Sequence, residues 1–352
     1  MEKEYSMDFP VFSPDELNTR AGLNPGGPET FSTPISSKEN LQRLYEGKTP
    51  LWIPYSSEWV GMHMDCDPEV FARHNPNGGL DGWGVEWVWE ESARGAMVRP
   101  GNPKCPDITH WEDYLTVPDP DSWDWEGSYE RNKDKFTPDR MRYSMASSTL
   151  FERLISVLDF GNAAMALIDD DQKEAVHRFF RVVTDKRKRF YELARQYYGI
   201  EIMNINDDWG SQRASFFGYD TAREMLFPYM KELCDCAHEL GMKVDLHCCG
   251  FVENLVPLFI EEGIDSWGGQ DLNDKCALKK QYGDQMIFSK ALDLSADATD
   301  EELDAAVADY MENFGFDNRV ICTGRDKRFY QRLYEASRRN FDRLVAEGKA
   351  IL

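Results

Sequence analysis

The sequence predicts an α/β fold, namely a (β/α)₈ TIM barrel over residues 37–352 that follows an irregular N-terminal extension over residues 1–36. From about residue 170 onward, amphipathic helical patterns alternate with short apolar runs, which is typical of βα units and a parallel sheet. A chain of 352 residues still fits a single barrel domain. The extension is rich in Pro, Gly, Ser and Thr and has no sustained period. A doubly wound open sheet uses the same local patterns and stays open as the alternative fold.

The expected elements follow one another in a regular order. The best strand candidates are residues 200–205, 243–247, 264–268, 286–289 and 319–322. Helical patterns separate them, at residues 173–198, 221–240, 253–262, 274–282 and 300–314. Gly241, Gly263 and Gly283 follow three of these helices, as expected of the residue that ends a helix. Weaker strand candidates in the N-terminal half, which bring the total to eight, are residues 51–55, 85–89 and 141–145.

Composition excludes several classes of protein. The 63 acidic and 40 basic residues give a formal charge of -23, which repels phosphate backbones and anionic lipid surfaces. We therefore expect neither nucleic acid nor membrane as a partner. The chain contains no apolar run of the roughly 18–20 residues that cross a bilayer, and its N-terminus lacks the features of a signal peptide, so a cytoplasmic location is expected. The eight cysteines, with neighbours at Cys248 and Cys249, are unlike a spaced disulfide framework and predict reduced thiols.

A candidate zinc site lies at the end of the strand expected over residues 243–247. Because side chains alternate along a strand, His247 and Cys249 should point to the same side. Cys322 closes the strand expected over residues 319–322, and in a barrel it would lie at the same C-terminal mouth. A catalytic zinc has three protein ligands and one open position. The sequence therefore predicts a site made of His247, Cys249 and Cys322.

The chemistry of such a site favours alkyl transfer over hydrolysis. Two thiolates cancel the charge of Zn²⁺ and leave a neutral centre, suited to holding a thiolate or an ether oxygen that leaves as an alkoxide or phenolate. The alternative is a chance H-x-C pattern, since buried cysteines often act as small hydrophobic residues. The remaining cysteines are interpreted as structural: Cys66, Cys105, Cys234, Cys236, Cys248 and Cys276.

Five motifs, in a fixed order, carry a resemblance to a known family. They are NDDWGSQ at 206–212, FPYMKELCDCAHELG at 227–241, HCCG at 247–250, LFIEEGIDSWGGQ at 258–270 and FSKALD at 288–293. From about residue 40 to its end the chain resembles the uroporphyrinogen decarboxylase superfamily, and within it the corrinoid-dependent zinc methyltransferase branch. That branch includes methylcobamide:coenzyme M methyltransferases and O-demethylase components. The resemblance implies His247, Cys249 and Cys322 as zinc ligands and Glu152 as a fourth, although Glu152 could equally be a solvated glutamate at a helix start.

The chain departs from the family in two places. The true decarboxylases carry an N-terminal arginine-rich element that grips a polycarboxylate, and residues 51–59 contain nothing like it. In the coenzyme M enzymes the cysteine that corresponds to Cys322 resembles one in a Pro-Gly-Cys context, whereas Ile321 and Thr323 flank Cys322 here. These departures make both a decarboxylase and a methylcobamide:thiol methyltransferase alternatives rather than the preferred function.

Further site residues are expected around the barrel mouth. Asp208 follows a strand and could accept a substrate hydrogen bond or shuttle a proton, which makes it the catalytic candidate beside His247. Asp207 is a substrate-binding candidate, with an N-cap or turn role as the alternative. Gln270 could orient a substrate oxygen, and Asp293 could cap the loop that follows it.

Aromatic residues crowd the N-terminal third. Trp83 and Trp87 are the substrate-binding candidates among them, because a methoxylated ring or a corrin macrocycle requires flat apolar surfaces, although most tryptophans belong to a core. The six histidines include no D-x-H-x-x-G pattern that would ligate cobalt, so the corrinoid should belong to a partner protein. The preferred function is methyl transfer between a small substrate, such as an aromatic methyl ether, and that corrinoid. A non-catalytic zinc or docking module is the remaining alternative.

Overall fold

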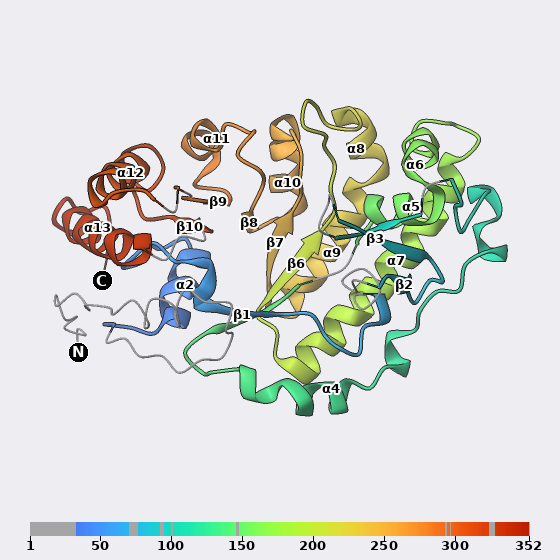
Figure 1. Cartoon of the computed structure of the whole chain (residues 1–352), viewed down its shortest axis with the longest axis horizontal. Coiled ribbons are helices and arrows are strands. Elements are labelled where there is room, and N and C mark those ends of the chain that lie inside the picture. The colour runs from blue at the N-terminus through green and yellow to red at the C-terminus, as the bar shows by residue number, and fades with distance from the viewer. Residues whose placement is uncertain are drawn as a thin grey trace. The chain divides into compact units, whose positions relative to one another are not determined.

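The structure is a computed structural model, and its description covers most of the chain. The described residues are 33–69, 77–91, 95–99, 101–145, 148–292, 294–295, 297–323 and 328–351. Most of the expected N-terminal extension and Asp293 lie outside them. The helices and strands are labelled in Figure 1. The chain divides into two compact units. Unit 1 comprises Met1–Gly61, Asn132–Arg142 and Asp265–Leu352, and unit 2 comprises Met62–Arg131 and Tyr143–Ile264.

Unit 2 is built around parallel strands that neighbour one another in chain order. They are β5 (Met141–Ser144), of which Tyr143 and Ser144 belong to this unit, β6 (Ile202–Asn206) and β7 (Lys243–His247). Strands β5 and β6 pair in parallel, and β6 pairs with β7 so that Asn206 lies opposite His247. Four of the five residues of β6 are buried, so both faces of this strand are covered, as expected for a parallel sheet.

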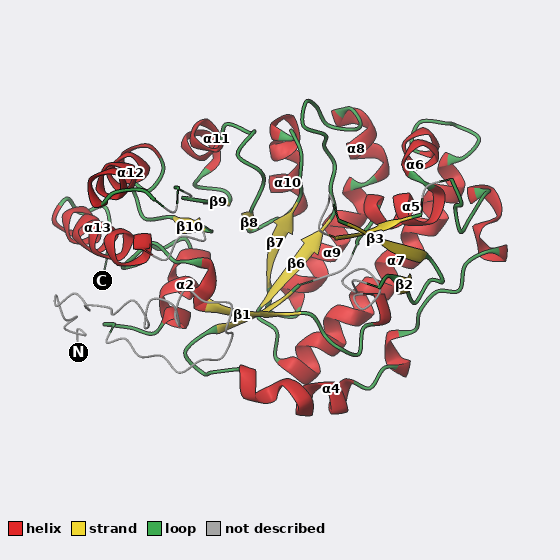
Figure 2. Cartoon of the chain, viewed as in Figure 1, coloured by secondary structure: helices red, strands yellow, loops and turns green. Residues whose placement is uncertain are grey.

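Helices connect these strands, as Figure 2 shows by colour. They are α4 (Trp125–Asn132), α5 (Phe151–Leu158), α6 (Phe160–Ala166), α7 (Lys173–Leu193), α8 (Tyr219–Met225), α9 (Phe227–Glu239) and α10 (Val256–Glu262). A π-helical turn over Ala194–Tyr198 extends α7, so the helix predicted over residues 173–198 is confirmed at both ends. The prediction of a single helix over residues 221–240 is wrong. The helix is interrupted at Leu226, and a second helix begins just before Pro228, which has no backbone N–H to donate inside a helix.

The strand expected over residues 85–89 exists but does not belong to the parallel sheet. It is β3 (Glu86–Glu90), the central strand of a three-stranded antiparallel sheet with β2 (Gly79–Leu80) and β4 (Gly95–Val98). Its alternating pattern fits a barrel strand and a hairpin strand equally well, which is why the sequence misplaced it. The small sheet supplies one wall of the cavity described below.

Unit 1 contains β8 (Ser266–Trp267), β9 (Ile287–Lys290) and β10 (Val320–Cys322), which pair in parallel and in chain order. Its helices are α2 (Ser37–Tyr45), α11 (Lys275–Tyr282), α12 (Asp300–Asn313) and α13 (Arg328–Ala346). A capping box between Ser36 and Glu39 begins α2, and another between Thr299 and Glu302 begins α12. Gly263 ends α10 with the expected positive φ, whereas Gly283 after α11 keeps a helical φ of -63°.

The strand expected over residues 51–55 is wrong. The segment is buried, but only Tyr55 forms a bridge, with Cys322, and the first strand, β1 (Trp59–Met62), begins later. Pro50 and Pro54 explain the difference, because neither residue has the backbone N–H that a strand ladder requires. Pro54 still contributes its carbonyl, which accepts a hydrogen bond from the Cys322 amide at 2.9 Å.

The predicted fold class is confirmed as an α/β fold of the TIM-barrel type. The order β5-β6-β7 in unit 2 and the order β8-β9-β10 in unit 1 follow the chain without the reversal that a doubly wound sheet requires. The described residues supply seven strands of parallel-sheet type where eight were expected. In the same described part of the chain, no helix is both long enough and apolar enough to span a membrane.

Candidate metal centre and substrate cavity

Three metal-ligating side chains converge where β6 and β7 end. Because Asn206 pairs with His247, the loops that follow the two strands begin side by side. Cys249 Sγ lies 3.2 Å from His247 Nε2, which in turn lies 3.9 Å from Asp208 Oδ1. The ligand atoms of Asp208, His247 and Cys249 all lie within 4.8 Å of one another. His247 and Cys249 thus share one side of the chain, as strand alternation predicted, while Cys248 is buried.

Asp208 links the two loops that carry this cluster. Its Oδ1 accepts a hydrogen bond from the Cys249 amide at 2.7 Å. A side chain in the loop after β6 thus holds the loop after β7 in place. Burial, followed by the negative charge of Glu152, raises the pKa of the Asp208 carboxyl. The sequence predicted Asp208 as a hydrogen-bonding or proton-transferring residue, and the structure adds it to the possible metal ligands.

Asp207 is fully buried and caps a helix that is distant in the sequence. Its carboxylate accepts hydrogen bonds from the amides of Phe151 at 3.0 Å and Glu152 at 2.8 Å, in the first turn of α5, and from Trp209 Nε1 at 2.7 Å. Leu150, the residue before α5, supplies no side-chain cap. Burial, with the nearby Glu152 charge, raises the pKa of Asp207 to about 7. This cap differs from the local N-cap or turn role that the sequence offered as the alternative for Asp207, and a role of Asp207 in substrate binding stays a prediction.

Glu152 is held beside this cluster. Its Oε2 accepts a hydrogen bond of 2.8 Å from Asn206 Nδ2, the last residue of β6. The Asp207 cap on its own amide fixes the position from which its side chain extends. Glu152 thus lies half-buried in the first turn of α5 with a fixed hydrogen-bond partner, and its service as a metal ligand stays a prediction.

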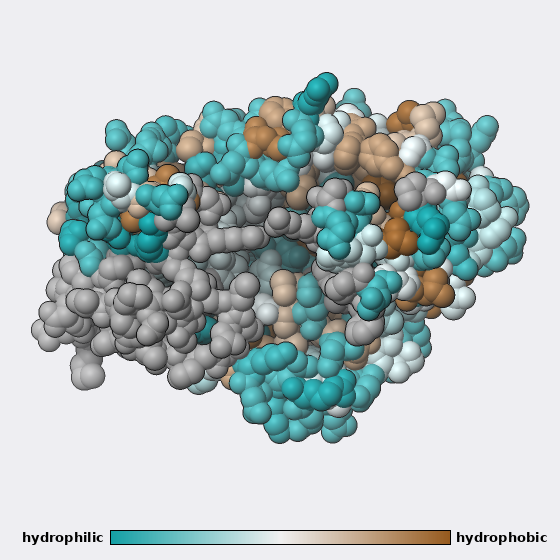
Figure 3. Space-filling view, viewed as in Figure 1, coloured by the Kyte–Doolittle hydropathy of each residue, from teal (hydrophilic) through white to brown (hydrophobic). Residues whose placement is uncertain are grey.

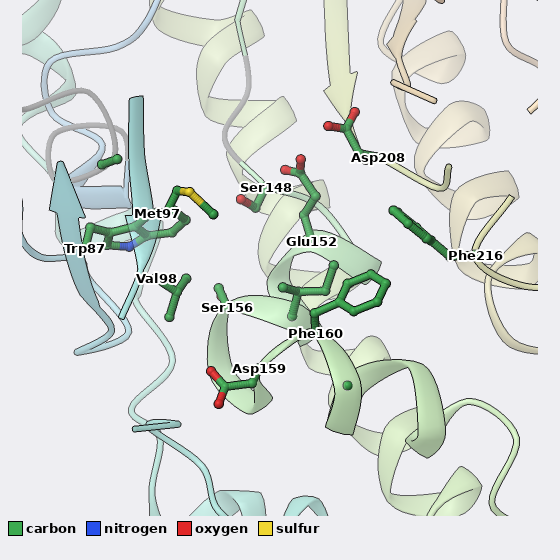
Figure 4. A pocket seen from close by; sticks show the side chains of 13 residues that line it. Trp87, Met97, Val98, Ser148, Glu152, Ser156, Asp159, Phe160, Asp208 and Phe216 are labelled. Atoms are coloured by element: carbon green, nitrogen blue, oxygen red, sulfur yellow. The ribbon is translucent and has the colours of Figure 1, made fainter. Parts of the chain in front are cut away.

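A cavity of about 560 Å³ opens next to these acids, entirely within unit 2 (Figure 4). It is lined by Trp87, Ala96, Met97, Val98, Ser148, Glu152, Ile155, Ser156, Asp159, Phe160, Gly161, Asp208 and Phe216. Figure 4 shows the carboxylates of Glu152 and Asp208 near one another, with Trp87 and Met97 on one side and Phe160 and Phe216 on the other. A cavity of this size and apolar character can hold a substituted aromatic ring.

The cavity reaches the protein surface. Phe160 is 46% exposed and stacks edge-on against Phe216, with 4.7 Å between ring centroids. Met97 on β4 and Met165 on α6 are also exposed. Figure 3 shows a mostly hydrophilic surface with apolar residues gathered over α6 and the small antiparallel sheet. A ligand or partner can therefore approach the cavity from this side.

A buried ionic cluster supports the cavity wall from behind. Arg153 pairs with Glu69 at 3.1 Å and Asp81 at 2.7 Å, and the side chains of all three are at most 1% exposed. Asp81 also accepts a hydrogen bond from Trp87 Nε1 at 3.1 Å, so this cluster orients the tryptophan that lines the cavity. Two further cations, Lys186 and Arg187, pair with Glu69 from α7.

Trp83 lies in this interior layer, not on the cavity wall described above. Its Nε1 donates to Glu69 at 2.8 Å, and its ring packs against Phe179 with 5.8 Å between centroids. Of the two tryptophans predicted to bind substrate, the structure thus places Trp87 on the cavity and Trp83 in the core. The buried acids and cations were missed from the sequence, because pairs that are distant in the chain leave no periodic signal.

Two predicted site residues belong to unit 1. Cys322 ends β10, is fully buried and forms an isolated parallel β-bridge with Tyr55 through its backbone. Gln270 follows β8. Its backbone carbonyl accepts two hydrogen bonds from Asn273, one from the backbone amide at 3.2 Å and one from the side-chain Nδ2 at 2.9 Å. Their contribution to the site stays a prediction.

Fold and site together define an α/β-barrel protein with a candidate metal centre beside an apolar cavity. The sequence matches no protein-family model and no curated protein. Among solved structures, the chain is similar to a methyltransferase from Methanosarcina mazei, with a TM-score of 0.60 and 13% identity over 88% of this chain and 99% of that one. At this identity the likeness shows the fold alone.

Two other structures are similar over smaller parts. One is the IOLI protein with a zinc atom (TM-score 0.28, 15% identity, 49% of this chain and 70% of that one). The other is a D-psicose 3-epimerase with D-fructose (TM-score 0.32, 10% identity, 64% of this chain and 84% of that one). Their TM-scores are too low to carry an argument.

Proposed function

We propose that this protein is a zinc-dependent methyltransferase, which moves a methyl group between a small methylated substrate and the cobalt of a corrinoid on a separate protein. The observation that carries the proposal is the cluster of Asp208, His247 and Cys249 at the edge of an apolar cavity that Asp208 also lines. The fold shared with a methyltransferase is compatible with this reaction class.

The cluster suits zinc in both chemistry and spacing. Zinc takes imidazole nitrogen, thiolate sulfur and carboxylate oxygen at about 2.0–2.3 Å, so two ligands of one ion lie roughly 3–4 Å apart. The 3.2 Å between Cys249 and His247 and the 3.9 Å between His247 and Asp208 fall in that range. We propose Cys322 as the further thiolate ligand and Glu152 as the ligand that substrate displaces. When bound, zinc would polarise the substrate oxygen, and the partner's Co(I) would supply the nucleophile.

The chain's own residues position the reactants. Asp208 holds Cys249 through its amide, and Asp207 holds the helix start that carries Glu152. Trp87 and Phe216 offer flat faces that would orient a ring and exclude water from the reacting methyl group. We therefore propose a methoxylated aromatic compound as the methyl donor.

The lining of the cavity disfavours the two enzymatic alternatives. The thirteen described residues that line it include Glu152, Asp159 and Asp208 but no lysine, arginine or histidine. A polycarboxylate substrate of a decarboxylase, or a sulfonated thiol such as coenzyme M, would bring further negative charge next to these acids. Neither offers the cavity a favourable charge interaction.

Transfer from an aromatic methyl ether to a Co(I) corrinoid protein, followed by the absorption change of cobalt, tests the proposal. We expect transfer only when protein, ether and reduced corrinoid protein are all present. The variant His247→Ala should lower the rate at least about a hundredfold, because the hydrogen bonds around the metal cannot replace a lost ligand. Cys248→Ala, on the neighbouring residue, is the matched control. Product formed without any corrinoid would overturn the proposal and favour a decarboxylase or another chemistry.

A further inference from the structure

Asp159 has a backbone conformation that residues with a side chain rarely adopt. Its φ of 72° and ψ of 156° lie in a region that essentially only glycine occupies, because a Cβ atom there crowds the backbone. The residue joins two helices, ending α5 and preceding α6. An aspartate at this position therefore strains the backbone locally, which points to a role for its carboxylate.

The Asp159 side chain lines the cavity at a distance from the proposed reaction centre. Figure 4 shows its carboxylate at the far end of the lined region from Glu152 and Asp208, with the walls made by Val98, Phe160 and others between them. Within the described part of the chain, its interaction is one hydrogen bond of 3.1 Å, from the Gly101 amide to Oδ2. This bond anchors the carboxylate without neutralising its charge.

The rest of the cavity has the character of a site for a cation. None of its thirteen described lining residues carries a positive charge, and its aromatic side chains are those of Trp87, Phe160 and Phe216. The negative faces of such rings attract an ammonium group, and a carboxylate in a partly desolvated cavity attracts it more strongly. A carboxylated ligand would meet only repulsion at this end.

We propose that Asp159 determines specificity by pairing with a protonated amine on the substrate. The ligand class is an aromatic methyl ether with its methoxy group toward Asp208 and an ammonium group at the opposite end, beside Asp159. The inference rests on the proposed function only in taking this cavity as the substrate site and in placing the methoxy group toward Asp208.

Binding to the intact zinc-loaded protein tests the pairing without any turnover. The probes are 3-methoxybenzylamine, 3-methoxybenzyl alcohol and 3-methoxybenzoate, which share one shape and differ in charge, titrated by calorimetry at neutral pH. We expect the amine to bind about tenfold more tightly than the alcohol, as a desolvated charge pair allows, and the benzoate to bind most weakly. In Asp159→Asn the amine should lose this advantage while the alcohol is unaffected. Glu174→Gln, on an exposed acid outside the cavity, is the control for net charge.

A second variant separates recognition from a purely structural role. Asp159→Gly removes the strain together with the carboxylate, so it should raise the urea midpoint of unfolding and abolish the amine preference. A lower midpoint with unchanged preference would assign Asp159 to the fold and overturn the inference, as would a benzoate that binds as well as the amine. If amine binding that depends on Asp159 is found but no corrinoid accepts a methyl group, the proposed function fails, while the pairing of Asp159 with a protonated amine stands.

Discussion

Gly210 and Gly250 lie against one another, backbone to backbone, in the two loops that carry the candidate metal centre. A Cβ atom on Gly250 would come within 2.0 Å of the Gly210 carbonyl carbon, and Gly250 also has a φ of 92°. The Phe251 amide donates to the Ser211 carbonyl at 2.7 Å beside this contact. Because Asp208 and Cys249 flank it, the glycine pair sets the distance between these two side chains.

The substitution Gly250→Ala should therefore damage the site and the fold together. The added methyl group meets backbone atoms, which cannot move aside as a flexible side chain can, and the positive φ adds strain. We expect a loss of stability of about 2–4 kcal/mol and a loss of bound metal, measured by urea unfolding and by metal analysis. Gly218→Ala is the control, since a Cβ there meets nothing within 4 Å. Equal behaviour of the two variants would contradict the close approach.

Metal content tests the proposed ligand set residue by residue. We expect about one zinc per chain in the purified protein. Cys249→Ala should release it, whereas Cys248→Ala, which alters the buried neighbour, should not. Cys322→Ala separates two possible third ligands, Cys322 and Asp208. If zinc survives Cys322→Ala but is lost in Asp208→Asn, then Asp208 and not Cys322 completes the site with His247 and Cys249.

The adjacent acids Asp207 and Asp208 should respond to substitution in opposite ways. Asp207→Asn replaces one of the acceptor oxygens on a group that receives hydrogen bonds from Phe151, Glu152 and Trp209. A buried donor then loses its partner, which costs about 1–3 kcal/mol. Asp208→Asn should leave stability within about 0.5–1 kcal/mol, because its side chain is partly exposed, but should weaken metal binding. Urea unfolding and zinc titration of both variants measure the contrast, and a reversed pattern would exchange the two roles.

Local sequence patterns predicted some elements with their exact bounds, but they could not predict contacts between residues that are far apart in the sequence. Strand β7 begins and ends as predicted, because Gly241 precedes and Gly250 follows a short segment in which apolar Val244 and Leu246 alternate with polar residues. The same alternation placed His247 and Cys249 on one side. The cap that Asp207 provides to α5 could not be predicted, because Glu152, whose amide donates to the Asp207 carboxylate, lies 55 residues away in the sequence. The partners of Arg153 are likewise 72 and 84 residues away.

Glu262, at the end of α10, provides the last prediction. Its side chain is fully buried, and both carboxylate oxygens lack a hydrogen-bond partner within the described part of the chain. Burial, together with the charges of Asp207 and Glu261, raises its pKa well above the usual value. The folded protein therefore keeps the proton on Glu262 at a pH where the unfolded chain has released it. Stability falls as pH rises above the unfolded pKa of about 4.3.

Glu262→Gln removes this titration while it keeps the shape of the side chain. The stability gained by the variant should be small near pH 4 and should grow by up to about 1.4 kcal/mol for each pH unit above that, until the folded pKa is reached. Urea unfolding of both proteins between pH 4 and 8 measures the difference. Glu174→Gln is the control, because Glu174 is exposed on α7 and is not among the charges that raise the pKa of Glu262, so its effect should stay small throughout. A gain from Glu262→Gln that does not change with pH would show that Glu262 ionises in the folded protein as readily as in the unfolded chain.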